Sequence, residues 1–260
     1  MNRLDTPTGA PKILTRVDGA TIGYYPEFGL NSPGIVFLGG FHSDMSGIKA
    51  TTLAAHCANR GRSYLRFDYF GHGVSAGDFR DGSIGRWRED ALAVLDELTE
   101  GPQILVGSSM GGWIALLVAL ARPERVAAVM GVAAAPDFTE DLIWNRLDEV
   151  QRRRLLESGE LTHDSAYEAA PIPITRKLVE EGRRHLLLRA PIKLDCPVRL
   201  LHGMRDPDIP YRTSLQLAER LAGTEVVVEL IEDGDHRLSR PADLDRLLGA
   251  IEEFSARFGS

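Results

Sequence analysis

One stretch of the chain decides its fold: Ile104-Leu105-Val106-Gly107-Ser108-Ser109-Met110-Gly111-Gly112-Trp113. Its centre has the spacing Gly-x-Ser-x-Gly, with Ser109 between Gly107 and Gly111. A serine nucleophile held on a tight turn between a strand and a helix needs close neighbours with almost no side chain, and both glycines meet that need. Because such pentapeptides also arise by chance, the flanking residues decide between a nucleophile elbow and an ordinary turn.

The residues on both sides of Ser109 have the pattern that an elbow requires. Residues 103–106 form a short apolar run typical of a buried strand, and residues 113–120 are apolar throughout, as in a buried helix. The sequence therefore predicts a strand, a turn and a helix in that order. Within the turn it predicts Ser109, rather than Ser108, as the nucleophile.

The composition limits both the architecture and the partners. A chain of 260 residues that is 43% hydrophobic has enough material for one large α/β domain, so we expect a single domain over residues 1–260. With 30 basic and 37 acidic residues the net charge is −7, so nucleic acid is not an expected partner. The densest basic cluster, Arg152 to Arg154, lies among glutamates and is predicted to be a solvated helix face.

Cysteine usage and apolar runs indicate the compartment. The two cysteines, Cys57 and Cys196, are too few for a disulfide framework and too isolated for a zinc site, so we expect core residues and no metal. Residues 1–12 lack the apolar core of a signal peptide, and the longest apolar run, 113–121, is too short to span a bilayer. These features predict a soluble, cytoplasmic protein without a transmembrane segment.

Short apolar runs alternate with helical patterns along most of the chain. A turn signal at Asp18-Gly19, between residues 12–17 and 21–25, predicts an antiparallel hairpin at the start. The alternation that follows predicts a mainly parallel sheet covered by helices on both faces. The predicted strands are 34–38, 63–67, 103–106, 126–132, 198–201 and 226–231, and the predicted helices are 46–59, 84–99, 110–121, 212–221 and 244–258.

One interval, residues 137–195, departs from this alternation. It is charged and helix-prone, with helices predicted over 139–157 and 176–188 and no strand. We expect an inserted helical lid over the sheet edge where open α/β sheets bind ligands; a peripheral decoration is the alternative. Its apolar residues could line an acyl groove or form the lid's own core: Leu142, Ile143, Trp144 and Leu147.

The acid partner of the serine is expected after a strand on the carboxyl side of Ser109. A serine needs a general base at neutral pH, and the base needs an acid to orient it. In chains with this elbow the order is serine, acid, histidine. Asp206, just after the strand predicted over 198–201, is the expected acid. Asp208, two residues further on, and Asp137, after the preceding strand, are the alternatives.

The base must follow the acid, and of the seven histidines only His236 does. It lies in a turn beyond the strand predicted over 226–231, where an imidazole can hang over the nucleophile. The other histidines have structural interpretations as strand-end, helix-face, loop or lid residues: His202, His56, His42, His72, His163 and His185.

Attack on a carbonyl creates an oxyanion, which requires backbone donors fixed in advance, each worth about 3 kcal/mol in comparable sites. The amide of Met110, at the start of a helix, is the first expected donor. The amide of Phe41, in the loop after the strand over 34–38, is the second, with Gly40 allowing close approach. His42 could contact the leaving group or the lid, although an ordinary loop histidine is the simpler interpretation.

Taken together, these features resemble the α/β-hydrolase superfamily from Lys12 to Phe258. Several segments look more closely like the ABHD10 group: Phe67-Asp68-Tyr69, Gly107 to Trp113, Ala121 to Val126, Leu200 to Asp206 and Asp235-His236-Arg237. Members of that group are acyl-protein thioesterases that remove palmitoyl from cysteine, and esterases that hydrolyse acyl glucuronides. The resemblance implies an α/β-hydrolase fold with a mostly parallel sheet of about eight strands and a helical lid.

The resemblance also implies ester or thioester hydrolysis by a Ser109, Asp206 and His236 triad, without a cofactor or metal. The substrate would be a small acyl ester or an acylated protein, and Trp144 of the lid, with Gly40 and His42, is expected to contact it. Two features depart from the group. Gly39-Gly40 stands where many members carry His-Gly, and the chain lacks the Arg-rich presequence of the mitochondrial animal members.

Other functions remain as alternatives at this stage. The same triad also serves peptidases and amidases, and a hydrolase-fold binding protein would have lost a triad member, whereas all three are present. A dehalogenase or epoxide hydrolase needs a carboxylate at the elbow, which Ser109 excludes. The sequence does not define the oligomeric state, although α/β hydrolases do dimerise.

Overall fold

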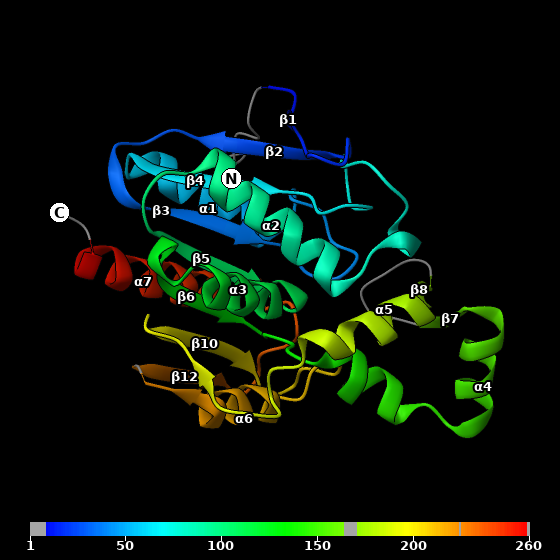
Figure 1. Ribbon diagram of the computed structural model, residues 1–260. Helices are drawn as coiled ribbons and strands as arrows, with labels where there is room; N and C mark the ends of the chain where they lie inside the picture. Colours follow the sequence, from blue (N-terminus) through cyan, green and yellow to red (C-terminus); the bar gives the residue numbers. More distant parts are fainter. Residues whose placement is uncertain (1–8, 164–170, 224, 259–260) are drawn as a thin grey trace.

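The apolar runs form one mixed sheet in the computed structural model, which describes residues 9–163, 171–223 and 225–258 (Figure 1). Within these residues the sheet has eight strands in the order β1-β2-β4-β3-β5-β6-β10-β12. β1 pairs antiparallel with β2, and β2 with β4, whereas every later pair is parallel. The strands are β1 (Lys12–Thr15), β2 (Thr21–Glu27), β3 (Asn31–Leu38), β4 (Arg62–Phe67), β5 (Gln103–Ser108), β6 (Val126–Val132), β10 (Val198–Gly203) and β12 (Val226–Ile231).

Helices cover both faces of the sheet, as the alternation predicts (Figure 1). One apolar core lies between the sheet and α2, α3 and α6, and a second lies between the sheet and α1 and α7. The hairpin, the parallel sheet and the expected fold class are therefore confirmed. The helices are α1 (Ile48–Asn59), α2 (Ile84–Leu98), α3 (Met110–Ala121), α6 (Arg212–Arg220) and α7 (Pro241–Phe258), with short 3-10 turns over Phe79–Asp81 and Pro123–Arg125.

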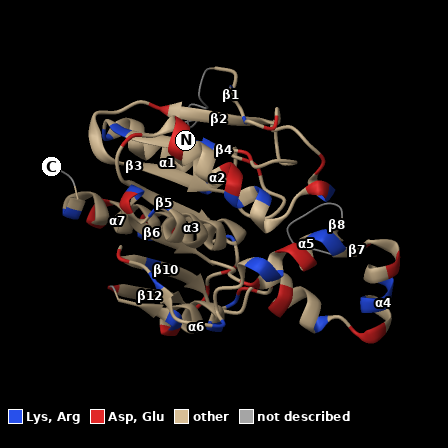
Figure 2. Cartoon of the chain, viewed as in Figure 1, with Lys and Arg blue, Asp and Glu red and all other residues tan. Residues whose placement is uncertain are grey.

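The elbow segment occupies the middle of the molecule. Every residue of β5 is buried, and α3 is buried from Met110 to Ala119. A strand buried on both faces and a helix buried all round both require the continuous apolar sequence found here. Figure 2 shows the consequence, since the charged residues lie in the outer helices and the loops, whereas the central strands β3, β5 and β6 contain none.

The interval 137–195, called the inserted segment below, contains strands that the sequence analysis did not predict. β7 (Glu160–His163) pairs antiparallel with β8 (Ile172–Thr175), and a two-residue β9 (Ile192–Lys193) pairs with β11 (Leu221–Ala222). The expectation of no strand was wrong because β7 and β8 are each only 4 residues long, too short to give a clear strand pattern, and their pairing with each other stabilises them. Residues 164–170 lie outside the described residues.

The two helices predicted in the inserted segment are also broken into shorter pieces. Asp148 caps a new helix, accepting a hydrogen bond from Gln151 N–H while Gln151 bonds back to the Asp148 amide. Because a capping box marks a helix start, the predicted 139–157 helix is interrupted there. The pieces are a π-helix over Thr139–Ile143, a 3-10 turn over Trp144–Arg146, α4 (Glu149–Ser158), α5 (Arg176–Gly182) and a 3-10 turn over Arg183–His185.

Both cysteines lie in the core as free thiols, as expected. Burial raises the pKa of the Cys57 thiol to about 12 and that of Cys196 to about 11. Among the described residues no helix has the length and apolar character needed to cross a membrane. The same residues contain no group of three or more His, Cys, Asp or Glu arranged to hold a metal ion.

Candidate active site

Ser109 stands on a strained turn between β5 and α3. Its φ of 54° and ψ of −119° lie outside the regions that L-residues ordinarily occupy, which is the strain expected of a nucleophile elbow. A Cβ on Gly107 would collide with the backbone of Gly111, and one on Gly111 would collide with the carbonyl of Leu38. The two glycines are thus required because neighbouring backbone passes too close for any side chain.

His236 and Asp206 meet Ser109 at the carboxyl edge of the sheet. His236 Nε2 lies 3.1 Å from Ser109 Oγ, and His236 Nδ1 lies 2.7 Å from Asp206 Oδ2. The residues are far apart in sequence, but β5, β10 and β12 are parallel, so the loops that follow them emerge at one edge. The structure therefore brings together the three residues that the sequence analysis selected.

The carboxylate of Asp206 is buried and held on both oxygens. Its Oδ1 accepts hydrogen bonds from the amides of Asp208 at 2.9 Å and Ile209 at 2.8 Å, and its Oδ2 lies 3.3 Å from His202 Nε2. Burial alone raises the pKa of Asp206, but the bonds from His202, His236 and the Ile209 amide outweigh it and hold the pKa well below its usual range. Asp206 is therefore a fixed negative charge behind His236.

The two alternative acids have other partners. Asp208 contributes its backbone amide to Asp206. Asp137 is fully buried and accepts hydrogen bonds from the amides of Leu187 at 2.7 Å and Leu188 at 2.9 Å. Burial raises the pKa of Asp137. Asp137 thus ties the two ends of the inserted segment together.

One predicted oxyanion donor, Met110, directly follows Ser109, and the other, Phe41, directly follows Gly40, which lies close to Ser109. Met110 is the first residue of α3, so its N–H has no acceptor within the helix. Gly40 is close enough that a Cβ on it would lie 3.5 Å from Ser109 Cβ. The Phe41 ring packs edge-on against Phe79, Trp87 and Phe138, with centroids 4.9, 5.8 and 5.5 Å away.

A cavity of about 400 Å³ opens over Ser109 and His236. Its wall combines polar and apolar side chains, and the apolar part includes Phe41, Phe138, Leu142, Ile143, Ile172 and Ile174. Its polar rim includes Lys49, Arg146 and His163, which come from three separate elements. The sequence analysis did not assign these three residues to the site, because no local motif marks side chains that only tertiary packing brings together.

The expected substrate contacts have different outcomes. Gly40 lines the cavity over Ser109, and His42 lines a second cavity beside it. Trp144 is not among the described residues that line the cavity over Ser109. The Trp144 ring instead packs against the guanidinium groups of Arg152 and Arg183, 5.3 and 4.7 Å from its centroid.

The comparison with known families agrees with this fold and site. Residues 35–247 match the family described as the alpha/beta hydrolase family. The match covers most of the chain, including Ser109, Asp206 and His236. The chain belongs to the α/β hydrolase family, which confirms the expected hydrolase class.

Within that family the chain is similar to mouse ABHD10, in both sequence and structure, and to a bacterial hydrolase of known structure. It is 42% identical over 223 residues, 85% of this chain and 75% of the relative, to palmitoyl-protein thioesterase ABHD10, mitochondrial, of Mus musculus. A putative hydrolase from Agrobacterium vitis S4 has a TM-score of 0.89 at 43% identity, over 95% of this chain and 97% of that one. The structure of mouse alpha/beta hydrolase domain-containing protein 10 also has a TM-score of 0.89, at 39% identity over 96% and 99%. The resemblance to the ABHD10 group is confirmed.

One expectation is contradicted by the same comparison. The sequence analysis predicted a cytoplasmic protein, whereas the curated ABHD10 relatives that it matches are named as mitochondrial. The prediction was wrong because it relied on the lack of a leader in the first residues, and such a lack carries no information about location.

Proposed function

We propose that the protein hydrolyses thioesters and esters of medium and long acyl chains through an acyl-enzyme on Ser109. The observation that carries the proposal is the continuous chain of contacts from Asp206 through His236 to Ser109 Oγ, at 2.7 and 3.1 Å, beneath a cavity whose wall includes a group of apolar side chains. The ABHD10 relatives are named palmitoyl-protein thioesterases, which supports a thioester as the substrate.

In this proposal His236 Nε2 takes the Ser109 hydroxyl proton as Oγ attacks the acyl carbonyl. His236 then gives that proton to the leaving thiolate or alkoxide, and the acyl group stays on Oγ. Water enters, loses a proton to His236, and releases the carboxylic acid. The Asp206 charge holds Nδ1 protonated throughout, so Nε2 is the nitrogen that accepts.

We assign the oxyanion to the amides of Met110 and Phe41. The Met110 N–H lies at the positive end of the α3 dipole, where negative charge is favoured. The Phe41 N–H lies in the turn that packs against the elbow at Gly40. Two fixed backbone donors stabilise charge that develops only after attack, which lowers the barrier rather than strengthening substrate binding.

We propose that the inserted segment acts as the lid of a single domain and selects the acyl chain. The inserted segment contributes four apolar residues to the cavity wall: Leu142, Ile143, Ile172 and Ile174. Two hydrogen bonds attach the inserted segment to helices α3 and α2. Trp113 Nε1 on α3 donates to the His185 carbonyl at 3.0 Å, and Gly85 N–H on α2 donates to the Glu181 carboxylate at 2.9 Å. A cavity of about 400 Å³ is within the usual range for small-molecule sites.

The test is a chain-length series of acyl-CoA thioesters and nitrophenyl esters, from acetyl to palmitoyl. We expect kcat/KM to rise beyond acetyl, and Ser109→Ala to remove turnover at every length. Ser255→Ala, a buried serine on α7, is the matched control and should keep wild-type rates. A maximum at acetyl would remove the long-chain assignment, and turnover by Ser109→Ala would remove the serine mechanism. Amide cleavage faster than ester cleavage would favour a peptidase.

A further inference from the structure

His72 is a buried histidine that the proposed mechanism does not use. It lies between β4 and α2, with 4% of its surface exposed. Its ring packs edge-on against Tyr69, Phe79 and Trp87, with centroids 5.7, 5.1 and 5.2 Å away. An imidazole in an aromatic cluster must have both ring nitrogens satisfied, because an unpaired buried polar atom costs free energy.

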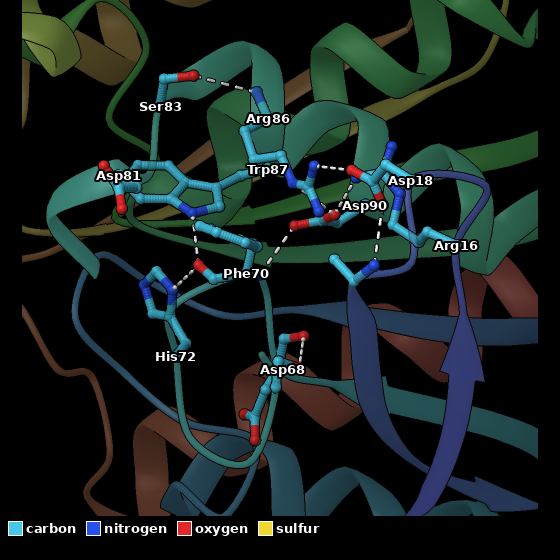
Figure 3. A network of polar contacts seen from close by, with 12 residues as sticks. Arg16, Asp18, Asp68, Phe70, His72, Asp81, Ser83, Arg86, Trp87 and Asp90 are labelled. Atoms are coloured by element: carbon cyan, nitrogen blue, oxygen red, sulfur yellow. Dashed lines mark hydrogen bonds and ion pairs between the residues drawn. The ribbon is translucent and has the colours of Figure 1, made fainter. Parts of the chain in front are cut away.

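Both ring nitrogens of His72 have backbone partners, and together they define its tautomer. Nδ1 lies 3.1 Å from the Phe70 carbonyl, which can only accept, so Nδ1 carries the proton (Figure 3). Nε2 lies 3.2 Å from the His42 amide, which donates to it, so Nε2 carries none. Burial lowers the pKa of His72 to about 4, so the ring stays neutral near pH 7.

The His42 amide, which donates a hydrogen bond to His72, belongs to the turn that carries the proposed oxyanion donor, the Phe41 amide. Ser43 N–H donates to the Gly40 carbonyl at 3.2 Å and closes a four-residue turn, in which His42 has a φ of 58°. A positive φ at the third position alone is the pattern of a type II turn, which favours glycine or asparagine there. A histidine in that position is strained, so another interaction must hold the turn in this form.

Type I and type II turns differ in the orientation of their central peptide, here the peptide between Phe41 and His42. The N–H of this peptide is the group that points to His72 Nε2. An acceptor on that side selects the type II orientation, whereas the type I orientation would turn the Phe41 carbonyl toward His72 instead. His72 therefore fixes the backbone immediately after the Phe41 amide.

We propose that His72 is a positioning residue that holds the oxyanion turn in its productive form by accepting the His42 N–H at Nε2. The inference rests on the proposed function, because the role of the Phe41 amide is assigned there. Catalytic donors must be held within about 0.5 Å of their productive position, so a turn free to change type would lose part of the oxyanion stabilisation.

The Phe70 backbone, which contacts His72 Nδ1, is also held by residues other than His72. Trp87 Nε1 donates to the Phe70 carbonyl at 3.0 Å, and Phe70 N–H donates to Asp90 Oδ2 at 2.8 Å (Figure 3). Asp90 is fully buried and is also bonded to Arg16. A substitution of His72 therefore leaves the Phe70 carbonyl with a donor, so its main effect falls on the His42 amide.

Two substitutions distinguish the acceptor role of His72 Nε2 from the donor role of His72 Nδ1. The terminal oxygen of glutamine lies as many bonds from Cα as Nε2 does, so His72→Gln can keep the acceptor for the His42 amide. Asparagine can place its amide nitrogen where Nδ1 stands, so His72→Asn keeps the donor to Phe70 and loses the acceptor. His56→Gln and His56→Asn, on a histidine paired with Glu252 on the far helices, are the matched controls.

The experiment measures the rate constant for phosphonylation of Ser109 by a fluorophosphonate, kcat and KM for an acyl thioester, and the unfolding temperature. For His72→Asn we expect the phosphonylation rate and kcat to fall by about tenfold or more with KM unchanged, since removing an oxyanion donor outright costs about 10²- to 10³-fold. His72→Gln and both His56 variants should stay within about threefold of wild type.

Equal rates in His72→Asn and wild type would overturn the proposal, and so would rescue by Asn but not by Gln. If His72→Asn does not fold, the test rests on His72→Gln. A folded His72→Gln variant with rates well below those of the wild type would then overturn the proposal. Phosphonylation reports on the oxyanion turn without any thioester. If it slows in His72→Asn while the wild type hydrolyses no thioester, the positioning role stands and the proposed substrate class fails.

Discussion

Two buried carboxylates follow neighbouring strands of the same sheet and have different roles. Asp206 comes after β10 and Asp137 after β6, and these strands pair in parallel. Each carboxylate accepts hydrogen bonds from two backbone amides of a nearby loop. Position at the sheet edge and backbone bonding are therefore common to both, and neither feature explains which one faces the histidine.

The difference lies in the remaining partners. Asp206 Oδ2 meets His236 and His202, and these bonds outweigh burial, so the pKa of Asp206 falls. Asp137 lies 3.5 Å from Arg189, which is half exposed, and burial prevails, so its pKa rises. The comparison teaches that the side chain facing each carboxylate decides whether it orients a base or anchors a segment.

The largest expected effect is on kcat in Asp206→Asn. The Asp208 and Ile209 amides hold Oδ1, so the asparagine oxygen stays with them and its NH2 group faces His236. His236 must then accept at Nδ1 and carry its proton on Nε2, where it cannot take the serine proton. We expect kcat to fall by about 10³- to 10⁴-fold, as in other serine triads. Asp137→Asn, assayed on the same acyl thioester, should stay within about fivefold; similar losses in both variants would break the comparison.

The second effect is on stability and belongs to Asp137. In Asp137→Ala the buried amides of Leu187 and Leu188 lose their acceptor. We expect the free energy of unfolding to fall by about 2 to 4 kcal/mol, the cost of two buried unsatisfied donors. Urea unfolding at pH 7 measures it, and kcat per folded molecule should remain near wild type. An unchanged urea midpoint would contradict the anchoring role.

The two carboxylates should also give stability opposite slopes with pH. The pKa of Asp206 is lower in the folded state, so the unfolded state binds more protons, and its stabilisation is lost as pH falls below about 4. The pKa of Asp137 is raised, so the folded state binds more protons, and stability falls as pH rises through the window just above about 4. Each slope is at most about 1.4 kcal/mol per pH unit.

Urea unfolding between about pH 3 and pH 6, a range that includes the usual carboxyl pKa, tests these slopes. Asp206→Asn should lose stability less steeply than the wild type at the acid end, and Asp137→Asn should lose less stability than the wild type as the pH rises above about 4. Parallel curves for wild type and both variants would contradict the assigned pKa directions.

The smallest effect is expected at Arg189. Its guanidinium pairs with Asp141 and lies near Asp137, but the side chain is 44% exposed. Exposed ion pairs contribute little, so Arg189→Met should lower the free energy of unfolding by less than about 1 kcal/mol. A loss as large as that of Asp137→Ala would show that the ion pair, rather than the two amides, anchors the inserted segment.

The parts of the site that follow local rules could be predicted from the sequence. The elbow at Ser109 depends on two nearby glycines, and the sheet depends on apolar runs, so both are visible in short windows. The choice of Asp206 and His236 depends on their order after the serine. These features can be predicted because they depend on short stretches of sequence or on the order of residues along the chain, rather than on how distant segments pack.

The inserted segment could not be predicted in the same way. β8 is stabilised by pairing with β7, and the Trp144 ring packs against the guanidinium groups of Arg152 and Arg183. Similarly, the bond from the His42 amide to His72 joins two loops that share no motif. Each of these depends on contacts between separate segments, and such contacts override local propensity.

The most direct test of the triad is to find where the acyl group resides during turnover. The protein is mixed with excess octanoyl thioester, quenched in acid within the first turnovers, digested and analysed by peptide mass spectrometry. The account predicts one octanoyl group on Ser109, absent from Ser109→Ala. An octanoyl group on Ser108 or on a cysteine, or turnover by Ser109→Ala without any acyl adduct, would contradict it.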